Sequence, residues 1–347
     1  MRQLPTVSIC LPCLNTARYL PACLRSISAQ TLVDWEVIIC DGFSSDGSWE
    51  ILKDFAFSTP NCIAFQSKAC LYDAWNECIS RAAGKYIYIA TSDDLVDADA
   101  LWLMSEALDR HPDYGICQIG LRYIDEYGRL LNSSQQWETG RLAAYHADFT
   151  KSTQKRTAPH DGVLMAAFHT VYESINQLLV RREVFDKVGC FDSGFGSVGD
   201  YEWGMRVALL ENCLFLAGPS AYWRRHAGQA TQPAFTACER LRALTMTRTA
   251  FHRARKLQPA KLPRPLLHGM EDIIYDDYIH ARIQRLNFRL LRLVVYGSEF
   301  LHRPVLVLRR LQRVVSGSTT TTFDYKRKRE RILTIMRRSF VRPPQFL

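Results

Sequence analysis

The first ninety residues alternate short apolar runs with stretches in which apolar residues recur three or four positions apart. The runs at 6–11, 36–40, 62–65 and 86–90 have the length and composition of buried strands. The stretches between them have the spacing of helices with one buried face. Strands that alternate with helices in this way predict an α/β fold with a mostly parallel central sheet and helices on both of its faces.

This alternation loosens after about residue 116. A hairpin is expected at 125–128, a strand at 177–180 and a helix over 200–210. On that helix Glu202 and Arg206 are four positions apart, which favours an ion pair between them.

The pattern divides the chain into three parts. We expect one large domain made of two halves, 1–110 and 111–235, followed by a helical extension over 236–347. The extension is rich in arginine and is predicted to be helical to its end.

Charge follows the same division. Residues 240–347 carry 24 Lys and Arg against 7 Asp and Glu, a net charge of +17, whereas residues 1–239 carry a net charge of −8. The composition, 47% hydrophobic and 23% charged, is that of an ordinary globular protein. Such an asymmetry suggests an acidic catalytic or binding body with an arm that meets a polyanion.

Eleven cysteines are scattered without the spacing of a disulfide framework, and Cys10, Cys40 and Cys117 lie inside apolar runs. Buried reduced thiols of this kind predict a reducing, cytoplasmic location. Neither a signal-peptide pattern nor an uninterrupted apolar stretch of about 18 residues is found. The best candidate, 290–307, is broken by charged residues and Pro304. We therefore expect a chain that does not cross a membrane.

Carboxylates follow two of the predicted strands. Asp41 comes directly after the second strand, and Asp93 and Asp94 come after the fourth. Because the carboxyl ends of parallel strands meet at one edge of a sheet, these side chains should share a crevice. Asp41 could accept a hydrogen bond from a nucleotide base or merely shape a turn. The Asp93–Asp94 pair could bind a divalent cation or cap a helix. Glycine-rich phosphate-binding fingerprints are absent from the sequence.

These weak signals form an ordered set of motifs. The set is PCLN at 12–15, QT at 30–31, DGFSSDG at 41–47, YDAWN at 72–76, SDD at 92–94, GCFD at 189–192, GDYEW at 199–203 and RRH at 224–226. Together they resemble the family 2 glycosyltransferases of the GT-A fold, the type that builds bacterial surface polysaccharides. The resemblance covers roughly 5–232 and leaves the basic extension outside.

The resemblance implies an enzyme that transfers a sugar from a nucleotide-diphosphate donor to an acceptor hydroxyl, with inversion and with Mg²⁺ or Mn²⁺. Asp200 matches the catalytic base, although a plain helix cap is the alternative, and Glu202 is the fallback base. Asp94 and His226 match the metal ligands. The residues matched to donor binding are Pro12, Asn15, Asp41, Asp73, Asn76, Asp93 and Arg225. The half over 1–110 would then bind the donor, and 111–235 would bind the acceptor.

Departures from the family pattern bear on the donor. Ser92 stands where relatives carry the first Asp of the Asp-x-Asp element, so Asp93 would take over the ribose contact or lie near the metal. Lys68 and Cys70 stand where many relatives carry an acidic residue and a glycine. Lys68 could meet a carboxylate or a phosphate of the donor.

The resemblance further implies a UDP-sugar donor and a glycan or lipid-linked acceptor in polysaccharide or glycolipid synthesis. In the extension, arginines and aliphatic residues alternate at helical spacing over 282–293, and 326–329 is a basic cluster. This pattern fits an anionic membrane surface on the inner face of the cell membrane, a helix face that covers the catalytic body, or an oligomer contact. Two other classes are a non-catalytic sugar-nucleotide binder and a nucleic-acid-binding protein. The extension shows no nucleic-acid recognition motif, which argues against the second.

Overall fold

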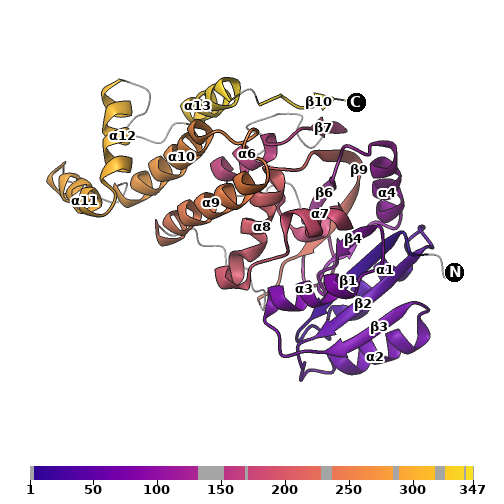
Figure 1. The fold of residues 1–347 in the computed structure, drawn as a ribbon. Coiled ribbons are helices and arrows are strands. Elements are labelled where there is room, and N and C mark those ends of the chain that lie inside the picture. Colours follow the sequence, from indigo (N-terminus) through magenta and orange to yellow (C-terminus); the bar gives the residue numbers. More distant parts are fainter. Residues whose placement is uncertain are drawn as a thin grey trace.

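The protein is built around one ten-stranded sheet (Figure 1). The computed structural model describes residues 4–131, 152–168, 171–227, 237–283, 289–316, 325–339 and 341–346. The strand order is β10-β7-β9-β6-β8-β4-β1-β2-β3, and β5 pairs with β9 outside this path. The predicted α/β fold with a helical extension is confirmed.

The four predicted strands of the first half are present within two residues of their expected bounds. They are β1 (Val7–Cys13), β2 (Trp35–Asp41), β3 (Cys62–Gln66) and β4 (Tyr86–Ile89). All of their mutual pairings are parallel. The helices between them are α1 (Leu20–Ser28), α2 (Ser48–Ser58) and α3 (Leu71–Arg81). Parallel pairing aligns the carboxyl ends of these strands at one edge of the sheet.

The second half of the sheet is mixed. Its strands are β5 (Leu95–Val96), β6 (Ile116–Ile124), β7 (Gln154–Arg156), β8 (Leu178–Arg181) and β9 (Cys213–Arg224). The long strands β6 and β9 pair in parallel, while β8 runs antiparallel to both β4 and β6. The expected turn at 125–128 follows β6, and Ile124 bridges back to Leu130.

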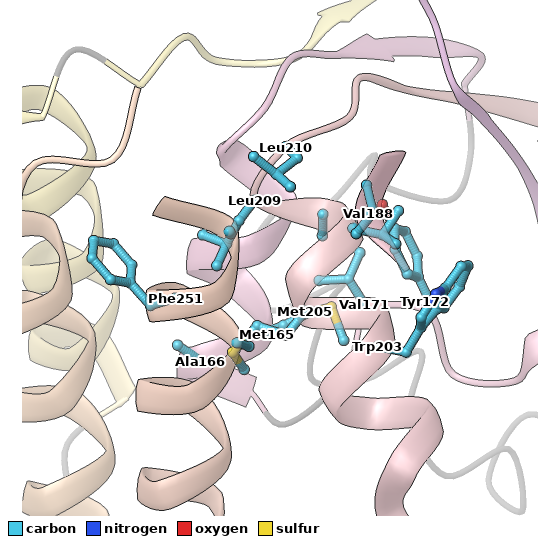
Figure 2. Packing of buried hydrophobic residues seen from close by; sticks show 14 of the residues in the cluster. Met165, Ala166, Val171, Tyr172, Val188, Trp203, Met205, Leu209, Leu210 and Phe251 are labelled. Carbon is cyan, nitrogen blue, oxygen red and sulfur yellow. The ribbon is translucent and has the colours of Figure 1, made fainter. Parts of the chain in front are cut away.

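Two helices of the second half, α6 (His160–Phe168) and α8 (Gly199–Ala208), pack against the extension. The other helices of this half are α4 (Ala100–Arg110) and α7 (Arg182–Val188), with the 3-10 helices η1 (Ile175–Gln177) and η2 (Ser193–Val198). Side chains of α6 and α8 pack with α9 of the extension in one buried cluster, in which Met165, Met205 and Phe251 take part (Figure 2). The core therefore continues past the predicted boundary near residue 235, which falls outside the described residues.

The extension is helical over α9 (Ala237–Leu257), α10 (Arg264–Ile283), α11 (Arg289–His302), α12 (Pro304–Val315) and α13 (Tyr325–Arg338). The expectation of helix to the very end is wrong, because β10 (Gln345–Phe346) pairs antiparallel with β7. In the predicted basic helix at 282–293, residues 284–288 lie outside the described residues.

Two smaller expectations concern membranes and cysteines. Among the described helices none is both long enough and apolar enough to span a bilayer. Cys10, Cys40 and Cys117 are buried free thiols, as the sequence predicted.

Candidate active site

Asp41 ends β2 and is fully buried at the carboxyl edge of the sheet. One of its carboxylate oxygens accepts the Ser44 hydroxyl (2.5 Å), and the other accepts the Ser44 backbone N–H (3.0 Å) and the Gln66 side-chain amide (2.9 Å). The carboxylate therefore shapes the turn after β2. Because Gln66 ends the neighbouring strand β3, the group is also fixed at the crevice between two strand ends.

The loop after β1 joins this turn to the Asp93–Asp94 segment. Asn15 has a positive φ of 52°, and its side-chain oxygen accepts the backbone N–H of Ser45 at 2.9 Å. Thr16 donates its hydroxyl to the hydroxyl of Ser92 at 3.0 Å. These bonds hold the ends of β1, β2 and β4 in one network, as the parallel topology predicted.

Asp93 presents its carboxylate to His226. The Nε2 atom of His226 lies 3.0 Å from Oδ2 of Asp93, and the two side chains are 10% and 22% exposed. His226 follows β9, and its ring packs 4.5 Å from the ring of Tyr19. Two potential metal ligands that lie 133 residues apart in sequence thus meet at the edge of the sheet.

Asp94 points inward and is only 4% exposed. Its Oδ1 accepts the backbone N–H of Arg224 at 2.7 Å, and its Oδ2 accepts the Thr91 hydroxyl and the Asn176 amide, the latter at 3.1 Å. Burial and the adjacent Asp93 raise the pKa of Asp94 well above its ordinary value. These bonds give Asp94 a structural role in the loop, and the Asp93 carboxylate is the one that meets His226. That Asp94 ligates the metal stays a prediction. Asp94 does not cap a helix.

Asp200 lies in the first turn of α8 and does not cap it, since the capping position is Val198. Its Oδ1 accepts the Tyr72 hydroxyl at 2.9 Å and the Tyr201 backbone N–H at 2.8 Å. Within the described part of the chain, no hydrogen bond is made to its Oδ2. Burial raises the pKa of Asp200, and the two hydrogen bonds only partly offset this effect.

Gly199 allows Tyr72 to reach Asp200. A Cβ atom at position 199 would lie 2.8 Å from the Tyr72 ring and 2.9 Å from the carbonyl oxygen of Asp192. Any larger residue would push the ring away, so this glycine is needed for a close approach.

Glu202 is a structural residue. It is fully buried, and its carboxylate pairs with Arg206 at 3.0 Å, as predicted, and with Arg253 of α9 at 3.4 Å. The fallback role as catalytic base is not supported, because both oxygens are held by guanidinium groups and no part of the carboxylate is exposed. Arg253 also pairs with Asp192 at 2.6 Å, so α9 braces the segment before α8.

The side-chain amide of Asn76 binds the backbone of Phe191. Its nitrogen donates to the carbonyl of Phe191 at 2.9 Å, and its oxygen accepts the backbone N–H of Phe191 at 3.1 Å. Asn76 therefore holds the loop that leads into η2, and its role in donor binding stays a prediction.

The remaining predicted site residues lie around the same strand ends. Pro12 is buried in β1, opposite Cys40 of β2. Asp73 accepts the thiol of Cys70 at 3.0 Å in the first turn of α3. Arg225 packs 4.7 Å from the centre of the Tyr123 ring. Lys68 is exposed and lies 5.8 Å from the centre of the Phe43 ring, beside the turn of Asp41.

Hydrogen bonds connect Asp41 with α3, the helix that carries the partner of Asp200. The carbonyl of Asp41 accepts the Ser67 N–H at 3.0 Å, and the Ser67 hydroxyl donates to Glu77 at 2.6 Å. Glu77 is on α3, the helix whose Tyr72 bonds Asp200. Hydrogen bonds place Asp41, Asp94 and the Asp93 partner of His226 at the ends of neighbouring strands, and α3 connects the Asp41 turn with Asp200. That Asp41, Asp94, Asp200 and His226 converge around one donor stays a prediction.

A divalent cation fits the Asp93–His226 pair. Carboxylate oxygen and imidazole nitrogen are both suitable ligands for Mn²⁺, and Mg²⁺ commonly takes one or two carboxylates plus phosphate oxygens. Over the residues described, no cluster of three or more His, Cys, Asp or Glu side chains is arranged to hold a metal. Such a cation would thus depend on oxygens from its ligand as well as on the protein.

Sequence reasoning missed several polar residues of this network. Tyr72 was inside a quoted motif but received no role, and Thr16 and Gln66 received none. The signal available for Gln66 was a polar residue directly after the strand predicted at 62–65. Thr16 lies three positions beyond the end of β1, just after the PCLN motif. Asn176 offered no such signal, because it reaches Asp94 from 82 positions away.

Comparison with known proteins identifies the class. The chain matches the model of glycosyl transferase family 2 over residues 8–189, which is more than half of its length. The chain therefore belongs to glycosyl transferase family 2.

One relative is the putative glycosyltransferase EpsE of Bacillus subtilis, which is 31% identical over 131 residues. That alignment covers 37% of this chain and 47% of EpsE, so the chain matches about half the length of this relative.

Solved structures share the fold. S. aureus TarS 1–349 superposes with a TM-score of 0.59 at 14% identity, covering 96% of this chain and 91% of that one. TarS 1–349 has also been solved with UDP and with UDP-GlcNAc. The mannosyltransferase PcManGT from Pyrobaculum calidifontis, in complex with GDP-Man and Mn²⁺, has a TM-score of 0.50 at 14% identity and covers 98% of this chain and 88% of that one.

Proposed function

We propose that the protein transfers a sugar from a UDP-sugar to an acceptor hydroxyl, with inversion at the anomeric carbon. The observation that carries this proposal is the Asp93–His226 pair at the carboxyl edge of the sheet, where Asn15 and Thr16 connect the loop after β1 to the Asp41 turn and to Ser92. Asp200, held by Tyr72 of α3, is the third group that the proposal uses. These groups supply a base contact, a diphosphate site and a proton acceptor. Membership of the family supports the same chemistry.

The nucleotide base would lie against the end of β2. Asp41 and Gln66 are held there side by side and can exchange hydrogen bonds with a ring N–H and a carbonyl of uracil. Lys68, exposed beside this turn, would contact a negatively charged group of the donor.

The diphosphate would lie at Asp93 and His226, which would hold Mg²⁺ or Mn²⁺ between them and the phosphate oxygens. A bound cation of this kind neutralises the charge that develops on the departing diphosphate. Asp94 would keep the loop in place through its bonds to Arg224 and Asn176.

Asp200 would act as the general base. Its Oδ1 is fixed by Tyr72 and Tyr201, so Oδ2 would take the proton of the acceptor hydroxyl. The acceptor oxygen then forms a bond to the anomeric carbon while the bond from that carbon to the diphosphate oxygen breaks. The nucleoside diphosphate leaves with the bonding electron pair, and attack from the opposite face inverts the configuration.

The acceptor would be a glycan or a lipid-linked sugar in the synthesis of a surface polysaccharide or glycolipid. Membership of glycosyl transferase family 2 and the motif set that resembles the enzymes of surface-polysaccharide synthesis motivate this class of acceptor without identifying the sugar.

The test compares Asp93→Asn with Asp94→Asn. Hydrolysis of a panel of sugar nucleotides is measured against Mn²⁺ concentration, and the free energy of unfolding is measured with urea. We expect Asp93→Asn to need at least about tenfold more Mn²⁺ at nearly unchanged stability. Asp94→Asn should instead lower stability by about 1–3 kcal/mol, because a buried acceptor is lost. Donor hydrolysis that ignores Mn²⁺ in the unmodified protein would exclude the proposed metal role.

A further inference from the structure

Helix α12 buries cations beside apolar side chains. Leu306, Val307 and Arg310 are 3%, 1% and 1% exposed, and Arg310 pairs with Asp276 of α10 at 2.6 Å. Arg309 and Arg313 pair with Asp272 at 3.1 and 2.6 Å. A surface helix normally turns its charges to water and its apolar stripe to the core.

The opposite side of α12 is apolar and exposed. Val305, Leu308, Leu311 and Val315 recur three and four positions apart and are 64%, 54%, 42% and 89% exposed. They therefore form one continuous stripe along the helix. Gln312 is the polar residue that interrupts it.

Exposed apolar side chains also lie on α11, which contacts α12: Val294, Phe300 and Leu301 are 66%, 44% and 82% exposed. We call these seven residues of 294–315 the outer apolar face. Among the described residues they make up seven of the eighteen large apolar side chains that are exposed, while the other eleven are spread over 4–257. A concentration of exposed apolar side chains on two neighbouring helices is a candidate interaction site. Figure 1 shows α11 and α12 at the end of the extension, far from β2 and β3.

Ion pairs fix this orientation of α12. Asp276 binds Arg310, Arg313 and Arg331 at once, and Glu271 binds Arg309 at 2.8 Å. Rotating the helix to bury Leu308 and Leu311 would bring these cations to the surface. It would take from the buried α10 carboxylates the partners that α12 supplies, including Arg309 and Arg313 for Asp272, which is costly.

The net charge of the extension indicates which kind of partner the outer apolar face binds. Five acidic residues of 240–347 are tied up in ion pairs with eight Lys or Arg side chains, namely Glu271, Asp272, Asp276, Asp277 and Glu299 with Arg248, Arg282, Arg303, Arg309, Arg310, Arg313, Lys328 and Arg331. Outside these residues the segment carries 16 Lys and Arg against two Asp and Glu. A second copy of the chain would bring the same excess positive charge to the contact.

We propose that the outer apolar face of α11 and α12 docks on an anionic lipid bilayer. The apolar side chains would enter the boundary between headgroups and acyl chains, while the excess cations of the extension would lie near the anionic headgroups. Apolar insertion and a basic charge excess together give stable binding where either alone is weak. This inference does not depend on catalysis, because lipid binding is measured without donor or acceptor.

The experiment is flotation of the full chain with phosphatidylcholine vesicles that contain about 30% phosphatidylglycerol, compared with pure phosphatidylcholine. We expect binding to the anionic vesicles. The triple variant Leu301→Gln/Val305→Gln/Val315→Gln should bind at least about tenfold more weakly, because three inserted side chains are lost. Raising the salt concentration should weaken binding by the unmodified protein only in part, since the apolar contribution is not screened.

The matched control is Leu4→Gln/Val33→Gln/Phe57→Gln, which alters side chains that are 66%, 88% and 96% exposed outside the extension. This control should bind vesicles like the unmodified protein. Both triple variants should melt at the unmodified temperature, since all six side chains are exposed. Equal binding by the two triple variants, or no flotation of the unmodified protein, overturns the proposal. So does a dimer in light scattering that the first triple variant dissociates while vesicle binding stays unchanged.

Discussion

The protein contains two groups of carboxylates with different partners: neutral hydrogen-bond donors at the sheet edge and arginines in the extension. At the sheet edge, Asp41, Asp94 and Asp200 accept hydrogen bonds from hydroxyl, amide and backbone donors. In the extension, Glu271 and Asp276 of α10 are bound by arginines from three other helices.

This difference is reflected in the pKa values. Burial raises the pKa of Asp94 and Asp200, and neutral donors only partly offset it. Burial also acts to raise the pKa of Glu271 and Asp276, but the arginines outweigh it and the pKa of each is lowered. Asp272 is the exception in the extension, since burial outweighs its arginines and its pKa is raised.

The comparison teaches which carboxylates are available for chemistry. A carboxylate neutralised by several guanidinium groups cannot take up a proton or a cation near neutral pH. A carboxylate held by neutral donors at a crevice keeps both options. The first kind stabilises the fold, and the second kind is the better candidate for catalysis.

The largest expected effect is loss of transfer in Asp200→Asn. The amide cannot accept the acceptor proton, so the transfer rate should fall by about 10²–10⁴ while donor affinity stays unchanged. Steady-state kinetics and calorimetric titration with UDP would measure the two quantities. Asp186→Asn, a change at an exposed residue of α7, is the control and should retain full activity. Normal transfer by Asp200→Asn would remove this residue from the role of base.

Arg310→Met should lower stability while leaving catalysis nearly unchanged, the reverse of Asp200→Asn. It removes a buried cation that bonds Asp276 and Tyr296, so the free energy of unfolding should fall by about 3–5 kcal/mol. The rate per folded molecule should change little. Urea denaturation gives the stability, and the exposed Arg338→Ala serves as the control with no expected change. A stable but inactive Arg310→Met protein would contradict the division between the two groups.

Tyr72→Phe should change the pKa of the proposed base, Asp200, without removing its carboxylate. The hydroxyl of Tyr72 bonds Asp200 and lowers its pKa, so its loss should raise that pKa further. Because the ionised carboxylate is the active form, the acid limb of the pH–rate profile should move to higher pH. The rate at neutral pH should drop by about tenfold or less. An acid limb that stays in place would argue that it reports another group.

The smallest effect concerns stability in acid. The folded pKa of Asp276 is lowered, so its contribution is present above its unfolded pKa and is lost as pH falls through the folded value. Asp276→Asn should therefore lose less stability than the unmodified protein on acidification, by about 1 kcal/mol for each unit of lowering. Asp200, whose pKa is raised, should have the opposite sign: it should favour unfolding as pH rises through the window between its unfolded and folded pKa values. Urea titrations at a series of pH values test both signs.

Much of the fold could be predicted from local pattern. The apolar runs placed β1 to β4 within two residues, because a buried strand needs a continuous apolar segment of that length. The strand at β10 was missed because two residues carry no periodic signal, and its partner β7 lies about 190 positions earlier in the chain.

The sequence predicted where the candidate site lies better than it predicted what each residue of the site does. Asp41, Asp93 and Asp94 follow strands, so parallel topology alone brings them to one edge. Asn76 and Glu202 lie in the family motifs and have polar side chains suited to donor binding and to base catalysis. The pairing of Glu202 with Arg206 followed from their spacing on one helix, whereas its second partner, Arg253, comes from α9. Phe191, which binds Asn76, lies 115 positions away and is identifiable as its partner only in the folded chain.

The sequence by itself determined the alternation of strands and helices, the family motifs and the excess of positive charge in the last third. Only the tertiary structure decided that Asp93 faces outward while Asp94 is buried, because the partners of Asp94 lie 82 and 130 residues away. It also decided that α12 exposes Leu308 and Leu311 while Arg310 is buried. An amphipathic pattern defines two faces of a helix, and the position of the buried α10 carboxylates determines which face turns inward.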